Sequence, residues 1–198
     1  MEWSNIMKNK KIFIIINTLY VIVPLLILIF PHLFKYKFYI LVTFGILIYF
    51  WLRKNNISNE DLGITNRNIT NSLISNLPII IISISIITLM KFLNINKFVP
   101  SETIFFYLFY IFISCPIQEF LYRSFYGYFD DGKYNIMLLS SSMYAFVHII
   151  YKDILTVILT FIIGLIWYNL YRKDKNLLGV SISHCIIGMI TILLGIID

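Results

Sequence analysis

Apart from tyrosine, cysteine and residues at helix ends, four ionisable side chains lie deep within apolar stretches of this sequence: Glu119, Arg123, His148 and His184. Glu119 and Arg123 are four residues apart, so on a helix they share one face and can form an ion pair. Ionisable side chains at membrane depth are costly, and they usually face a bundle interior or a hydrated cavity. These four residues are therefore the candidate catalytic residues.

Two imidazoles and a carboxylate support two kinds of chemistry. Glu119, His148 and His184 together match the donor set of a His-His-Glu zinc site. The same three groups can instead activate water without a metal. In both cases Arg123 holds the Glu119 carboxylate in place. A structural interpretation competes with both, because intramembrane histidines also serve as interhelical hydrogen-bonding residues and a buried ion pair can orient one helix in a bundle.

Helix geometry predicts that these residues meet. If the stretches before and after residues 130–133 form an antiparallel hairpin, position 119 lies opposite position 144, about 6 Å along the helix from His148. His184 lies about 10 Å into the last apolar stretch, and Glu119 about 15 Å from the 130–133 turn. Pro116 precedes Glu119 by one turn and predicts a bend beside the carboxylate.

The composition is that of a polytopic membrane protein in which these helices are embedded. Hydrophobic residues make up 59% of the 198 residues and charged residues 13%, against about 25% charged in soluble domains. Mean hydropathy is +0.83. We predict an all-α bundle of about seven transmembrane helices in the cell membrane, with the lipid bilayer as its surroundings, at residues 12–30, 38–52, 73–92, 103–129, 134–151, 154–171 and 177–197.

Charge and composition also predict orientation and organisation. With a cytosolic N-terminus, eleven of the 16 lysine and arginine residues, including every arginine, fall on the cytosolic side, as the positive-inside rule requires. The net charge of +6 is scattered over loop ends, which argues against a nucleic-acid partner. Residues 1–72 form an N-terminal two-helix region and cytosolic loop, and residues 73–198 form the core bundle of one continuous domain.

From about residue 60 to 197 the sequence resembles the CAAX-protease and bacteriocin-processing family of intramembrane endopeptidases, also called the Abi or CPBP family. The family motifs Glu-Glu-x-x-x-Arg, Phe-x-x-x-His and His-x-x-x-Asn correspond to Gln118-Glu119-x-x-x-Arg123, Tyr144-x-x-x-His148 and His184-x-x-x-Gly188. The resemblance implies an endopeptidase that cuts a peptide or protein near the cytosolic leaflet. Prenylated proteins, bacteriocin or pheromone precursors and membrane regulators all remain candidate substrates.

The leading hypothesis assigns a role to each candidate residue. Glu119 with His148 deprotonates water, directly or through zinc. His184 stabilises the carbonyl oxygen or completes the metal site.

Two positions depart from the family motifs. Gln118 replaces the glutamate assigned to water activation, and an amide cannot act as a base, so Glu119 would have to turn inward at a distortion near Pro116. Gly188 replaces the asparagine that, in the family, is proposed to stabilise the oxyanion together with the histidine at the position of His184. These departures motivate an alternative function, a catalytically inactive family member acting as a membrane interaction or immunity protein. A transporter with a proton-relay histidine is a third hypothesis, against which the lack of repeat symmetry counts.

Overall fold

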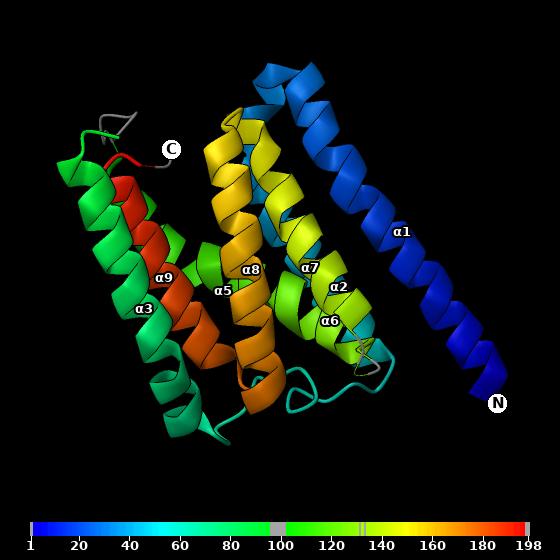
Figure 1. The fold of residues 1–198 in the computed structure, drawn as a ribbon. Helices are drawn as coiled ribbons and strands as arrows, with labels where there is room; N and C mark the ends of the chain where they lie inside the picture. The colour runs from blue at the N-terminus through cyan, green and yellow to red at the C-terminus, as the bar shows by residue number, and fades with distance from the viewer. Residues whose placement is uncertain (1, 96–101, 131, 133, 197–198) are drawn as a thin grey trace.

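The computed structural model describes residues 2–95, 102–130, 132 and 134–196, and the residues it describes form an all-helical bundle without strands (Figure 1). Its helices cover the seven apolar stretches predicted from the sequence, which confirms the fold class. The first three stretches form α1 (Glu2–Ile29), the short η1 (Pro31–Tyr36), α2 (Lys37–Lys54) and α3 (Ile69–Phe92). The last three form α7 (Tyr134–Val147) with η4 (His148–Tyr151), α8 (Ile154–Asp174) and α9 (Leu177–Leu193).

The fourth stretch carries Glu119 and is wound irregularly. It consists of α4 (Ile104–Phe109), η2 (Tyr110–Ser114), α5 (Cys115–Glu119), η3 (Phe120–Ser124) and α6 (Phe125–Tyr128), of which η2 and η3 are π-helical turns. Pro116 has no N–H with which to continue the regular hydrogen-bond ladder. The wide turns η2 and η3 stand on either side of the helical turn that holds this proline and Glu119. Single π-helical turns of this kind are often found at functional sites.

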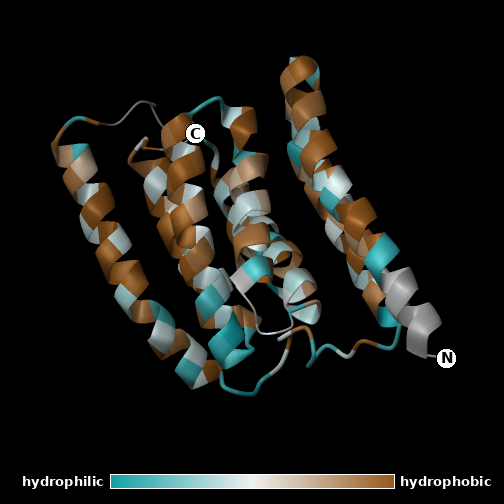
Figure 2. Cartoon of the chain, turned by 45° about the vertical axis from the view of Figure 1, so that its right-hand side comes forward, coloured by the Kyte–Doolittle hydropathy of each residue, from teal (hydrophilic) through white to brown (hydrophobic). Residues whose placement is uncertain are grey.

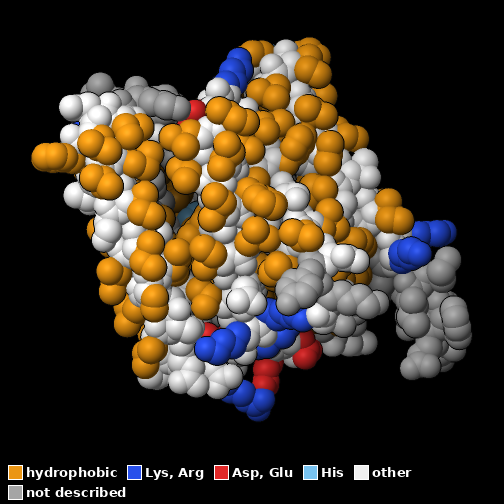
Figure 3. Space-filling view, in the orientation of Figure 1, with side chains coloured by type: hydrophobic (Ala, Val, Ile, Leu, Met, Phe, Trp, Pro, Cys, Tyr) orange, Lys and Arg blue, Asp and Glu red, His pale blue; other side chains and the backbone are white. Residues whose placement is uncertain are grey.

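The surface of the bundle is suited to lipid. Five of the described helices are long and apolar enough to cross a membrane, and the segments Asn135–Tyr151 and Leu177–Leu193 are shorter apolar helices. Large apolar side chains point outward, for example Ile81 at 62% exposure and Phe92 at 83%. Figure 2 shows hydrophobic residues along every long helix, and Figure 3 shows them covering the visible face above a band of charged side chains. The protein is a multi-pass membrane protein.

The two termini lie at opposite ends of the bundle (Figure 1), as an odd number of antiparallel passes requires. Helix α1 packs against α7 and η4, and α2 packs against α5, so both N-terminal helices contact the core. Helices α3 and α9 form one close pair, and α7 and α8 form the other. A cytosolic N-terminus and a division of the chain near residue 72 stay predictions.

The polar loop between α2 and α3 is tied to the bundle by hydrogen bonds. Within the loop, the backbone N–H and hydroxyl of Ser58 both donate to Asp61, and these bonds lower the pKa of its carboxyl. Leu62 is fully buried, and its carbonyl accepts from the Ser124 hydroxyl in η3. Asn176, just before α9, donates to the carbonyls of Thr65 and Arg67. The loop thus links η3 to the start of α9, the two elements beside the candidate site.

Candidate active site

Glu119 joins the fourth membrane segment to α9. Its side chain is fully buried, and its Oε1 lies 2.7 Å from Nδ1 of His184. Its Oε2 lies 3.0 Å from Nε of Arg123, one turn further along. A carboxylate without exposure to solvent is costly unless it is paired. The imidazole and the guanidinium together provide that pairing.

Arg123 is likewise fully buried, which requires several partners for its charge. Its guanidinium lies 4.9 Å from the centre of the Tyr144 ring, and Nη1 donates to the Ser140 hydroxyl at 3.5 Å. The contact with Glu119 is close but does not have hydrogen-bond geometry, and Nη2 has no acceptor within the part of the chain described. The stabilisation of the pair is therefore mainly electrostatic, with a cation–π contribution from Tyr144.

The His184 ring is held by contacts on its face and at both nitrogens. It stacks on Trp167 with ring centres 4.7 Å apart, and the Trp167 indole donates to the Ser183 hydroxyl at 2.9 Å. Nε2 lies 3.4 Å from the Tyr144 hydroxyl. The Glu119 carboxylate accepts, so Nδ1 of His184 carries a proton, and in the neutral tautomer this is the only N–H of the ring. Nε2 is then an acceptor.

His148 begins η4 at the end of α7, and its tautomer follows from one contact. Its Nδ1 lies 2.7 Å from the Tyr144 carbonyl oxygen. A carbonyl can only accept, so Nδ1 carries the proton and Nε2 keeps a basic lone pair. The His148 ring also meets the Tyr144 ring edge to face at 4.9 Å. His148 is therefore fixed as a neutral imidazole with one basic nitrogen available.

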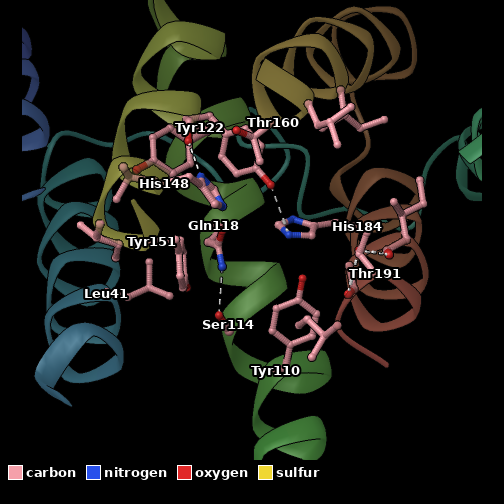
Figure 4. A pocket seen from close by; sticks show the side chains of 18 of the residues that line it. Leu41, Tyr110, Ser114, Gln118, Tyr122, His148, Tyr151, Thr160, His184 and Thr191 are labelled. Carbon is pink, nitrogen blue, oxygen red and sulfur yellow. Dashed lines mark hydrogen bonds between the residues drawn. The ribbon is translucent and has the colours of Figure 1, made fainter. Parts of the chain in front are cut away.

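The site opens onto a cavity of about 400 Å³ lined by residues from all seven membrane segments. Most of the lining is apolar, and its polar side chains include Tyr110, Ser114, Gln118, Tyr144, His148 and His184. Figure 4 shows Gln118 near the middle of this group, with His148 on one side and His184 on the other. The Gln118 amide nitrogen donates to the Ser114 hydroxyl at 3.0 Å. Glu119 and Arg123 lie behind the cavity wall.

The structure pairs the predicted residues differently from the sequence-based expectation. Glu119, Arg123 and His184 form one contiguous cluster. His148 bonds to a backbone carbonyl, and no hydrogen bond joins it to Glu119 among the described residues. Glu119 has not turned into the cavity, where Gln118 faces His148 instead. The expected partnership of Glu119 with His148 in water activation therefore has no direct contact to support it.

Sequence reasoning missed the polar side chains that share the cavity wall with the histidines. Tyr110, Ser114 and Gln118 follow one another at intervals of four residues, which places them near one helix face. The wide turn η2 contains the first two of them. This spacing was a usable signal, but the chain has 14 tyrosines, so the pattern did not stand out.

The predicted zinc ligands do not fit a metal in this arrangement. Both oxygens of Glu119 are engaged, by His184 and Arg123, and His148 lies apart from that pair. Among the described residues, no group of three or more His, Cys, Asp or Glu side chains is arranged to hold a metal ion. We therefore derive no reaction step through a metal.

The cavity reaches the end of the bundle that lies opposite the N-terminus. Its lining there includes Lys37 and Glu102, which lie at the starts of the second and fourth membrane segments. The positive-inside count assigns this end to the outer side, whereas the sequence-based hypothesis puts cleavage near the cytosolic leaflet. Rise per residue fixes only how deep each residue lies along its helix. The direction in which the space between the helices extends depends on how the helices pack.

The fold and the site are those of a polytopic membrane protein in which a buried acid and two histidines, on separate helices, lie at or beside an intramembrane cavity. Residues 100–190 match the family model described as Type II CAAX prenyl endopeptidase Rce1-like. The match spans just under half of the chain, supports its resemblance to the CAAX-protease family and contains all four predicted site residues. No curated protein and no solved structure matches the chain.

Proposed function

We propose that the protein is a membrane-embedded endopeptidase in which His148 activates a water molecule held against Gln118. The observation that carries this proposal is the fixed tautomer of His148 at the wall of the cavity. Its Nδ1 bonds to the Tyr144 carbonyl, which leaves Nε2 as a base. The match of residues 100–190 to the CAAX endopeptidase family model supports peptide hydrolysis as the reaction class.

The amide of Gln118 suits the role of positioning this water. Its nitrogen donates to Ser114, and its oxygen lies on the side of His148 (Figure 4). The amide oxygen and Nε2 of His148 are both acceptors, and two facing acceptors need a donor between them. A water molecule can donate one proton to each. Gln118 thus orients the nucleophile, although it cannot deprotonate it.

The reaction then needs one base and one acid, and His148 can serve as both. As the water oxygen bonds to the peptide carbonyl carbon, His148 Nε2 takes the water proton. When the carbon–nitrogen bond breaks, the same nitrogen returns the proton to the leaving amine. General acid–base catalysis of this kind contributes about 10²–10⁴-fold to a rate. Glu119 and Arg123 act as positioning residues, because they hold His184 on the other side of Gln118.

The substrate is a peptide segment that can enter an apolar cavity inside the membrane. The cavity volume, about 400 Å³, is within the usual range of ligand pockets, about 300–1,000 Å³. The family description supports a prenylated CAAX peptide as the first probe. Processing of a bacteriocin-type precursor is the alternative substrate hypothesis.

The test uses purified full-length protein in lipid nanodiscs and internally quenched peptides with and without a farnesylated CAAX cysteine. We expect cleavage by the wild type, and a loss of about 100-fold or more in kcat for His148→Ala. His32→Ala is the matched control, since His32 is exposed in η1 and lies outside the cavity lining.

Two outcomes would contradict the proposal. Unchanged turnover in His148→Ala would exclude His148 as the base. A wild type that cleaves none of the peptides, with Glu119→Gln affecting only stability, would favour the non-catalytic interaction or immunity role.

A further inference from the structure

The carbonyl-oxygen side of the site lacks an obvious hydrogen-bond donor. The oxygen of a peptide carbonyl becomes an oxyanion as water adds, and donors aimed at it are usually the largest single contribution to catalysis. His184 cannot donate from Nε2 while its proton is on Nδ1 toward Glu119. Gly188, one turn after His184, has no side chain. A donor must therefore come from another element.

The Tyr110 hydroxyl occupies the space that a side chain at residue 188 would fill. A Cβ built on Gly188 would overlap the Tyr110 hydroxyl oxygen and would press on its ring. The Tyr110 ring meets the His184 ring edge to face, with centres 6.0 Å apart. Tyr110, His184 and Gly188 all line the cavity, and Figure 4 shows the tyrosine below His184 and beside the Gln118–Ser114 pair.

The hydrogen-bond partner of this hydroxyl is weak enough for a ligand to replace it. The hydroxyl donates to the Cys115 thiol, and a thiol is a weaker acceptor than a carbonyl oxygen. The hydrogen bonds of the described residues include no carboxylate or carbonyl acceptor for Tyr110. The position is set by η2, which begins at Tyr110 and directs residues 110 and 114 toward the same cavity as Gln118.

Resting on the proposed endopeptidase function, we propose that the Tyr110 hydroxyl donates a hydrogen bond to the substrate carbonyl oxygen, and that Gly188 makes room for it. In this arrangement the fourth membrane segment supplies both the residue that orients the water, Gln118, and the donor for the oxyanion. A side chain on α9 is not needed. The glycine in the third motif is then an adaptation to a tyrosine donor and not a loss of function.

The first test is Tyr110→Phe, which keeps the ring and removes only the hydroxyl. We expect kcat for the quenched CAAX peptide to fall about 100-fold with little change in KM, since loss of one oxyanion donor costs about 10²–10³-fold. Tyr107→Phe is the matched control, because Tyr107 lies one turn earlier and outside the cavity lining. A Tyr110→Phe enzyme with unchanged kcat, or with a change in KM alone, would overturn the proposal.

A swap of donor between helices separates a catalytic hydroxyl from one that merely fills space. Tyr110→Ala/Gly188→Asn removes the tyrosine and places an amide donor on α9 in the vacated space. We expect kcat of this double variant to be at least about tenfold higher than kcat of Tyr110→Ala. No recovery, with both proteins equally stable, would contradict a donor role.

Gly188→Ala gives a second measurement in case Tyr110→Phe folds poorly. Its methyl group should displace the hydroxyl and lower kcat by a similar factor, and Tyr110→Phe/Gly188→Ala should lose little more than either single variant. Additive losses would overturn the proposal. A wild-type protein inactive on all peptides would instead overturn the endopeptidase function itself, whereas activity that requires His148 but not Tyr110 would reject only this inference.

Discussion

Removal of the Arg123 charge should destabilise the bundle more than any exposed charge does. Arg123 and Glu119 both have no exposed side-chain area and lie 3.0 Å apart. Arg123→Met keeps most of the side-chain volume but leaves the carboxylate with His184 alone. Breaking a buried pair by removing one partner costs about 3–5 kcal/mol. That is a large share of a typical stability of about 5–15 kcal/mol, and it corresponds to a roughly 100- to 4,000-fold change in the unfolding equilibrium.

Arg67→Met is the matched control for this measurement. Arg67 also pairs with a glutamate, Glu60, but the two side chains are 76% and 47% exposed. A solvent-exposed pair contributes only about 0–1 kcal/mol. Unfolding by SDS in mixed micelles, followed by tryptophan fluorescence, gives both free energies of unfolding. If Arg123→Met lowers the free energy of unfolding by an amount within about 1 kcal/mol of the control, the assignment of Glu119 and Arg123 as a buried, interacting pair is refuted.

The double variant Glu119→Gln/Arg123→Met tests whether the cost arises from an unpaired charge. Removing both charges leaves no buried ion without a partner, so the double variant should be more stable than the sum of the two single losses implies. Additive losses would mean that the two side chains stabilise the fold independently. Cleavage activity should stay low in every variant that lacks Glu119, because His184 then loses its charged hydrogen-bond partner.

Three further predictions follow from the site and from helix packing. Gln118→Glu should raise kcat at least about tenfold, because a carboxylate beside His148 increases its basicity, and a fall in cleavage rate would contradict this. Chelators such as 1,10-phenanthroline should leave cleavage unchanged, because the described residues offer no three-ligand group; full inhibition that zinc reverses would contradict this. Gly179→Ala should lower the free energy of unfolding by about 1–3 kcal/mol, since its Cβ would meet the Ser72 backbone between α3 and α9. Gly164→Ala, whose Cβ would have its nearest neighbours at 3.3 Å, should cost less in the same SDS titration, and an equal loss would refute the packing argument.

The four candidate site residues stood out in the sequence because charge is so rare in these stretches. An ionisable side chain within twenty apolar residues has few structural uses, so Glu119, Arg123, His148 and His184 could be selected without coordinates. The Glu119–Arg123 pair was also predictable, because residues four apart on a helix are neighbours whatever the rest of the fold does. The seven membrane stretches followed from hydropathy alone.

The pairing of those residues across helices was decided by rotation of the helices, which hydropathy does not encode. Rise per residue placed Glu119, His148 and His184 at similar depths in the membrane. From depth alone, the three side chains were predicted to form one cluster. The two π-helical turns around α5 set which side chain of the fourth segment faces the cavity, and that side chain is Gln118 and not Glu119. Such turns depend on packing against neighbouring helices as well as on Pro116.

Local sequence therefore determined the membrane helices, the buried ion pair and the identity of the chemically active side chains, since these depend on composition and on spacing within one helix. Three contacts depend instead on how separate helices pack. They join Glu119 to His184, His148 to a backbone carbonyl, and the Tyr110 hydroxyl to the space beside Gly188. Side chains far apart in the chain meet only when the whole bundle has set their orientation, and this is why the cavity and its donors emerged from the three-dimensional structure.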